Sequence, residues 1–207
     1  PPFICLVVSG GHTAIIRVDD YNHHEIIGET LDDAVGESFD KVARVLGLGY
    51  PGGPKVSALA ENGKNFIEFT KPNHELGYNF SFSGKKTAII NYVHTLEQAG
   101  KPIPKEDICY SFEKSAVDEL VEKTINATKE YGYKKIVLAG GVSANKRLRA
   151  ELTRVARENG IECYIPKMEY CTDNAAMIGS AGYYAFINGV GTVSYTHLRA
   201  HETDQYL

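Results

Sequence analysis

Apolar and polar positions predict strands at the start of the chain. Residues 3–8 form a near-continuous apolar run, residues 14–18 alternate, and Ile26-Ile27 continues the pattern after a turn. Gly10-Gly11 separates the first two runs and can take positive φ angles, and Asp19-Asp20 begins the second turn. We therefore predict a three-stranded antiparallel meander.

The period then changes to a helical one, with glycines that supply several of the helix ends. The predicted helices cover residues 35–46, 54–61, 85–98 and 106–130, a segment that follows Asn145 and ends at Gly160, and residues 173–188. Short strands are predicted at residues 79–84, 136–139 and 163–166. Strands interleaved with helices indicate an α/β protein.

The chain is organised around residues 136–145, an apolar run that stops at Gly140-Gly141 and restarts as a helix. This pattern predicts a buried strand that opens onto a cleft, because glycine lets a ligand approach the backbone. Ser143 and Asn145 are both expected to cap the helix that follows. An ordinary turn with a polar cap explains the same stretch equally well.

Three further segments could contact a ligand. The turn of Ser9, Gly10-Gly11 and Thr13 presents N–H groups and hydroxyls that suit a phosphate, although a plain hairpin is the commoner explanation. Glu37 and Asp40 lie one helical turn apart, so their carboxylates could bind ribose or a metal, or simply face solvent. The loop of residues 50–54 allows close ligand approach or serves only as a connector.

Composition narrows the class of protein. With 207 residues and 43% hydrophobic content the chain can bury a substantial core. No apolar run approaches the roughly 18 residues of a membrane span, so we expect a cytoplasmic protein without membrane contact. The four cysteines have no CxxC spacing, which predicts reduced thiols. A net charge of −4 leaves only local basic patches for nucleic acid, at residues 146–149 and 85–86, and solvated helix faces explain those charges as well.

Six motifs, in order, resemble the TsaD family, the tRNA threonylcarbamoyladenosine synthases. They are Val7-Val8-Ser9-Gly10-Gly11-His12-Thr13, Gly36-Glu37-Ser38-Phe39-Asp40-Lys41, Tyr50-Pro51-Gly52-Gly53, Phe80-Ser81-Phe82-Ser83-Gly84, residues 140–145 and Cys171-Thr172-Asp173-Asn174-Ala175-Ala176. The resemblance implies that residues 1–192 form the second domain of an actin, Hsp70 and sugar-kinase (ASKHA) fold. That domain has a mixed sheet with flanking helices and a helical insertion around residues 65–130.

The resemblance also implies a function. The intact enzyme would be an acyltransferase that moves the threonylcarbamoyl group of threonylcarbamoyl-AMP to N6 of adenosine-37, in tRNAs that read codons starting with A. Its partners would be tRNA and the companion subunits of the modification complex. Val7, Val8, Ser9, Gly10 and Gly11 would hold the phosphate or carbamoyl end of the substrate, Asp40 and Gly53 its ribose, and Asn145 with the Gly140-Gly141 backbone its adenosine.

Asp173 would be a ligand of one divalent metal, iron or zinc, although outside the motif it reads as a plain helix cap. Family members carry an HxxxH metal-binding pair in an N-terminal domain. Only His197 and His201 have this spacing here, in a stretch unlike the family. We therefore expect the chain to be a fragment that is inactive alone and binds adenylate incompletely.

Other departures and alternatives remain. Lys85 stands where the family usually has leucine, with the fold expected to stay intact, and residues 193–207 read as a foreign or unstructured tail. No catalytic nucleophile or base is identified, since the spacing of Ser9 and His12 is not that of a triad. The alternative functions are an ATP-dependent small-molecule kinase of the same superfamily and a non-catalytic scaffold paralogue.

Overall fold

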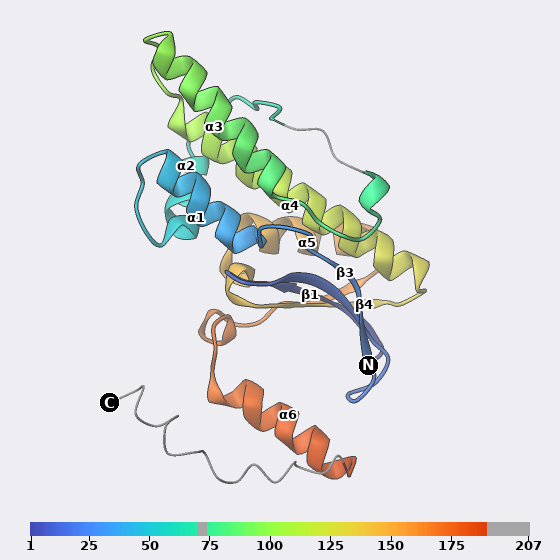
Figure 1. The fold of residues 1–207 in the computed structure, drawn as a ribbon. Helices are drawn as coiled ribbons and strands as arrows, with labels where there is room; N and C mark the ends of the chain where they lie inside the picture. Colours follow the sequence, from blue (N-terminus) through green and yellow to red (C-terminus); the bar gives the residue numbers. More distant parts are fainter. Residues whose placement is uncertain (70–73, 190–207) are drawn as a thin grey trace, which may run out of the picture. The chain divides into compact units, whose positions relative to one another are not determined.

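The computed structural model describes residues 1–69 and 74–189. The chain divides into two units, residues 1–173 and residues from 174 onward, and each is described by itself. The first unit contains a five-stranded sheet with the order β3-β2-β1-β4-β5 (Figure 1). Its strands are β1 Phe3–Val8, β2 Thr13–Val18, β3 His24–Glu29, β4 Lys135–Ala139 and β5 Glu162–Tyr164.

The sheet is mixed. β1, β2 and β3 pair antiparallel, which confirms the predicted meander, and β4 and β5 continue the sheet in parallel with β1. Leu6 at the centre of β1 lies opposite Ile15 on one side and Leu138 on the other. The expectation of positive φ angles in the first turn is wrong: Gly10 and Gly11 take ordinary φ values, because residues 9–12 form a four-residue connection instead of a two-residue turn.

The predicted helices of the first unit are present within three residues at each end. They are α1 Val35–Val45, α2 Gly52–Ala60, α3 Ser83–Gln98, α4 Lys105–Glu130 and α5 Lys146–Glu158, with 3₁₀ turns η1 His74–Leu76, η2 Gly141–Ala144 and η3 Met168–Tyr170. Gly47, Gly100 and Gly160 follow α1, α3 and α5 with positive φ, as their position after the helical periods predicted.

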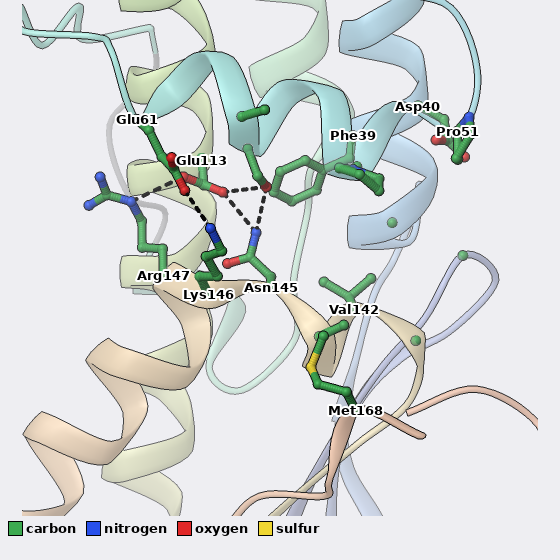
Figure 2. A pocket seen from close by; sticks show the side chains of 18 of the residues that line it. Phe39, Asp40, Pro51, Glu61, Glu113, Val142, Asn145, Lys146, Arg147 and Met168 are labelled. Atoms are coloured by element: carbon green, nitrogen blue, oxygen red, sulfur yellow. Dashed lines mark hydrogen bonds and ion pairs between the residues drawn. The ribbon is translucent and has the colours of Figure 1, made fainter. Parts of the chain in front are cut away.

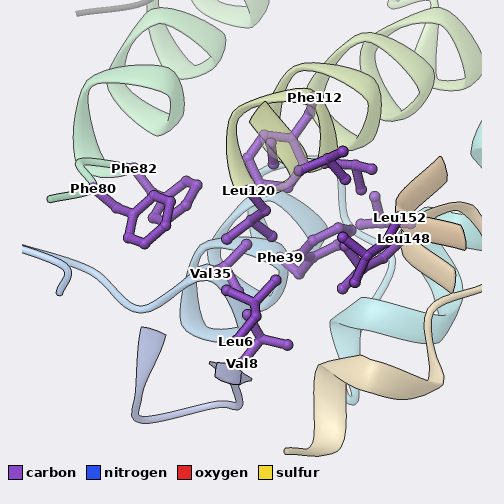
Figure 3. Close-up of a cluster of buried hydrophobic side chains, with 14 of the residues drawn as sticks. Leu6, Val8, Val35, Phe39, Phe80, Phe82, Phe112, Leu120, Leu148 and Leu152 are labelled. Carbon is purple, nitrogen blue, oxygen red and sulfur yellow. The ribbon is translucent and has the colours of Figure 1, made fainter. Parts of the chain in front are cut away.

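One hydrophobic core joins the sheet to the helices of the first unit. Alternate residues of β1 and β4, including Leu6 and Leu138, point into it and are fully buried. Figure 3 shows Phe39 of α1 and Phe112 of α4 among these side chains, and their rings meet edge to face at 4.9 Å. The strand and helix periods of the sequence therefore converge on a single interior, which holds the strand ends and the helix starts in place.

Residues 79–84 do not form the predicted strand. Phe80 makes one isolated bridge to Thr30, and α3 begins at Ser83. The reason lies 50 residues away, because the Asp32 carboxylate accepts hydrogen bonds from the N–H groups of Phe82 and Ser83 and from two serine hydroxyls. Burial raises the pKa of Asp32, but these hydrogen bonds outweigh it and lower the pKa overall. The carboxylate thus starts a helix where alternation predicted a strand.

Lys85 is buried, with only 6% of its surface exposed. Its ammonium lies 3.1 Å from the Glu119 carboxylate and 3.0 Å from the Ser115 hydroxyl, so the buried charge has an ion-pair partner and a hydrogen bond. The fold therefore accommodates a cation at this position by supplying a carboxylate from α4.

The second unit contains α6, Ala175–Ile187. The sequence suggested Asp173 as the N-cap of α6, and this prediction is wrong. Asn174 takes that position, and its side chain accepts the Met177 N–H at 3.1 Å. The predicted tail, with His197 and His201, lies outside the described residues. The predicted insertion and domain limits stay predictions.

Among residues 1–69 and 74–189, no helix has both the length and the apolar character needed to cross a bilayer.

Candidate functional site

The first unit contains a cavity of about 770 Å³, open to solvent, beside the ends of β1 and β4. Its walls come from segments far apart in the sequence: the turn after β1, α1, α2, α4, the start of α5, and the two 3₁₀ turns η2 and η3. Figure 2 shows Phe39, Val142 and Met168 among the apolar residues around it, with a polar group at one end. Such a mainly apolar cavity with a few polar groups is typical of a small-molecule site.

Five of the residues predicted to bind substrate line this cavity, namely Gly10, Asp40, Gly53, Gly141 and Asn145. A Cβ added to Gly53, or to the neighbouring Gly141, would meet no atom within 4 Å, so the backbone of both residues is open to a ligand. Val7, Val8, Ser9, Gly11 and Gly140 are not among the lining residues. The structure therefore gathers half of the predicted substrate-binding set around one cavity.

Ser9 holds the turn after β1 together through hydrogen bonds within the turn. The Ser9 hydroxyl accepts the His12 N–H at 3.0 Å and the Gly11 N–H at 3.3 Å, and the Ser9 N–H donates to the His12 carbonyl at 2.8 Å. Two of the backbone donors expected to face a phosphate are thus already used within the turn. Gly10 is the part of this turn that reaches the cavity.

Asp40 and Glu37 have different surroundings, although they lie one helical turn apart. Asp40 Oδ1 accepts the Gly52 N–H at 2.7 Å, which ties the start of α2 to α1 at the cavity wall. Glu37 forms an ion pair with Lys41 at 2.8 Å and is not a lining residue. The two carboxylates therefore do not act as a pair on one ligand, and Asp40 alone remains a candidate.

Asn145 combines two tasks. Its Oδ1 accepts the Leu148 N–H at 2.8 Å and caps α5, as predicted. Its Nδ2 donates to Ser57 Oγ at 2.9 Å and to Glu113 Oε1 at 2.7 Å. Ser143 is not a second cap, because it lies within η2 and its buried hydroxyl has no hydrogen-bond partner in the part of the chain that the structure describes.

Glu113 stands at the centre of the polar group and is only 4% exposed. The Ser57 hydroxyl donates to its Oε1 at 2.6 Å, and Arg147 Nε donates to its Oε2 at 3.2 Å (Figure 2). The sequence interpretation gave Glu113 and Ser57 no role, and it placed Arg147 only in a basic surface patch. A signal existed, since Glu113 is a charged residue that shares the apolar stripe of α4 with Cys109 and Ala116.

The basic residues expected to form surface patches have partners. Lys146 lies 2.9 Å from the Glu61 carboxylate, whose hydrogen bond and charge raise the pKa of Lys146. Arg149 donates to the carbonyls of Ser143 and Pro166, at 3.0 and 2.7 Å. These cations therefore hold the cavity wall and its neighbouring loop together, and do not form an unpaired basic surface.

Asp173 does not build a metal site by itself. Its side chain is exposed, and over the described part of the chain no three or more His, Cys, Asp or Glu side chains come together as a metal site would require. One carboxylate is too small a donor set for iron or zinc. The metal stays a prediction, and no chemical step is assigned to it.

Comparisons with known proteins identify the family. A family profile described as TsaD, tRNA N6-adenosine threonylcarbamoyltransferase, matches residues 1–180. The chain belongs to this family. A relative of that name from Caldicellulosiruptor saccharolyticus is 53% identical over 190 residues, which cover 91% of this chain and 56% of the relative. One from Clostridium botulinum strain Kyoto is 52% identical over 194 residues, which cover 93% and 57%. The chain thus spans about half the length of these relatives.

Solved structures support the ASKHA-like fold of this family member. A full-length HypF in its phosphate- and nucleotide-bound form is similar with a TM-score of 0.64 and 16% identity, over 89% of this chain and 33% of HypF. The HypF of T. kodakarensis is similar with a TM-score of 0.56 and 22% identity, over 76% of this chain and 20% of that protein. At such low identity the likeness shows the fold alone. It confirms the predicted mixed sheet with flanking helices.

Proposed function

We propose that this chain is part of an enzyme that transfers a threonylcarbamoyl group from threonylcarbamoyl-AMP to N6 of adenosine-37 in tRNA, and that the cavity holds the adenylate part of the donor. Family membership supports the reaction class. The observation that carries the site is the meeting of Gly10, Asp40, Gly53 and Asn145 around one cavity. These residues come from four motifs spread over more than half of the chain.

In this proposal each wall contributes one kind of contact. Gly10 offers backbone at the end of β1, where a phosphate can approach without a side chain in the way. Asp40 would accept hydrogen bonds from ribose hydroxyls while its Oδ1 keeps α2 in position through Gly52. Apolar residues that also line the cavity, among them Phe39 and Val142, would cover the faces of the adenine ring.

Asp173 remains a proposed ligand of a divalent metal, which would supply Lewis-acid chemistry when bound. Among residues 1–69 and 74–189 only this one carboxylate is proposed for the metal, so its remaining ligands would have to come from outside these residues. We therefore propose that the chain alone binds adenine nucleotides no tighter than about millimolar, roughly 4 kcal/mol, and does not catalyse transfer.

A chemical-shift titration of the 207-residue chain with AMP tests this proposal. We expect shifts at Gly53 and Asn145, and we expect Gly53→Leu to abolish them, since the new side chain would extend into the cavity. Gly84→Leu is the matched control. Gly84 is also the second residue of a helix and also has open space at its Cβ, but it does not line the cavity.

Two results would overturn the proposal. If AMP shifts survive Gly53→Leu, or appear elsewhere, the cavity is not the nucleotide site. If the chain alone modifies tRNA at a robust rate in a threonylcarbamoyl-transfer assay, the reaction needs no further domain and the assignment of half a site is wrong. An ATP-dependent kinase activity on small molecules would instead favour the wider superfamily.

A further inference from the structure

The centre of the polar group at one end of the cavity is a buried carboxylate that no motif contains. We propose that Glu113 is a positioning residue: it holds Ser57, Asn145 and Arg147 in the arrangement with which they face an adenylate. This inference rests on the proposed function of the cavity.

Burying a carboxylate is costly unless donors replace the lost water. Three side chains donate hydrogen bonds to Glu113, and none of them belongs to α4, the helix that carries Glu113. Ser57 belongs to α2, Asn145 ends η2, and Arg147 lies in the first turn of α5. A single side chain therefore ties together three walls of the cavity.

The two oxygens of Glu113 have separate tasks. Oε1 accepts from Asn145 and Ser57, which are also bonded to each other at 2.9 Å, so these three residues close a ring of hydrogen bonds. Oε2 accepts from Arg147, whose guanidinium also stacks 5.0 Å from the centre of the Tyr110 ring. In Glu113→Gln, one of the two oxygens that accept hydrogen bonds remains, and an NH2 group that can only donate replaces the other.

The position of this group decides which part of a ligand it affects. In the view of Figure 2, Asp40 and Pro51 lie on one side of the cavity, and Glu113, Asn145 and Arg147 lie well apart from them on the other. If Asp40 contacts the ribose, as proposed above, the Glu113 group lies toward the base. Loss of Glu113 should then weaken the binding of a ligand that has a base and leave one without a base unchanged.

The test compares AMP with ribose 5-phosphate in chemical-shift titrations of the 207-residue chain. Because hydrogen bonds to charged groups are the strong ones, Glu113→Gln should weaken AMP about tenfold and leave ribose 5-phosphate binding unchanged. Glu122→Gln is the matched control, because it removes the same charge from an exposed position of α4 and should change neither affinity. Equal AMP affinity in wild type and Glu113→Gln would overturn the inference.

A second readout needs no ligand. In wild type the Asn145 side-chain amide is held by two acceptors, so its hydrogens should exchange slowly with water, and Glu113→Gln should speed that exchange. Unchanged exchange would overturn the positioning role. If Glu113→Gln does not fold, Ser57→Ala opens the same ring while keeping the carboxylate, and it should show faster exchange and weaker AMP binding.

These measurements separate the two proposals. If AMP causes no shifts in wild type, the proposed nucleotide site fails, while faster exchange in Glu113→Gln still supports the ring of hydrogen bonds. If AMP binds in the cavity of wild type and of Glu113→Gln with equal affinity, the nucleotide site stands and the role of Glu113 falls.

Discussion

Two Gly-Gly turns follow neighbouring parallel strands in this protein, and they use their glycines differently. Gly10-Gly11 follows β1, and Gly140-Gly141 follows β4, which pairs with β1. The first turn leads into an antiparallel strand and is closed by the Ser9 hydroxyl. The second leads into η2 and α5 and is joined to the cavity wall through Asn145.

The difference lies in what surrounds each glycine. A Cβ on Gly10 or Gly11 would meet nothing within 4 Å. Gly140 has φ 92° and ψ 166°, a region that only glycine adopts readily, and its Cβ would lie 2.3 Å from the Val8 carbonyl oxygen. The first turn therefore has room for side chains at both glycines. In the second turn, Gly140 permits a close contact with the backbone of β1 that a side chain would block.

The largest effect that tests this contrast is expected from Gly140→Ala. Backbone strain and the clash with Val8 together should cost about 3 kcal/mol, which lowers the melting temperature by roughly 10 °C. Thermal unfolding followed by circular dichroism measures it. Gly141→Ala is the control and should stay within about 0.5 kcal/mol, since its Cβ has open space. A Gly140→Ala protein as stable as this control would refute the contrast.

Asn145→Ala should have the next largest effect. It removes the cap of α5 and two hydrogen bonds at the cavity wall, for a loss of about 2 kcal/mol in the free energy of unfolding. Asn145→Ser keeps a capping hydroxyl, so it should recover about 1 kcal/mol of that loss in urea unfolding. If both variants lose the same stability, the cap contributes nothing measurable and the network carries the whole effect.

Ser9→Ala should cost less, about 0.5 kcal/mol. The N–H groups of Gly11 and His12 that lose the Ser9 hydroxyl are exposed, so water can replace it. Ser9→Thr keeps the hydroxyl and serves as the control in the same urea unfolding series. A loss above about 2 kcal/mol would mean that the first turn depends on its side chain as strongly as the second turn does.

Gly11→Ala should have the smallest effect and can even stabilise the protein by up to about 0.5 kcal/mol, because alanine restricts the unfolded chain more than glycine does. The native φ of Gly11 is ordinary and its Cβ has room. Differential scanning calorimetry can detect so small a change in melting temperature. A clear destabilisation would show that the first turn also needs glycine for its shape.

The sequence by itself determined most of the helices and strands of this protein and the sides on which they are buried. Apolar residues that recur with a strand or helix period report which side of an element is buried, and glycines after a period report where a helix ends. This local information predicted the meander and the helices, and six short motifs predicted the family. It also placed Asn145 at the start of α5, since a cap acts on the next turn of its own chain.

Only the tertiary structure decided which polar groups meet. Asn145 and Ser57 are 88 residues apart, and Asp32 starts α3 from 50 residues upstream, so no local pattern could pair them. Residue 140 has to be a glycine because the Val8 carbonyl of β1 lies where a Cβ would be. This close approach results from the pairing of β1 with β4. The partners of Glu113 and Lys85 follow from the same cause, since a buried charge takes whatever donors or acceptors the folded chain brings within reach.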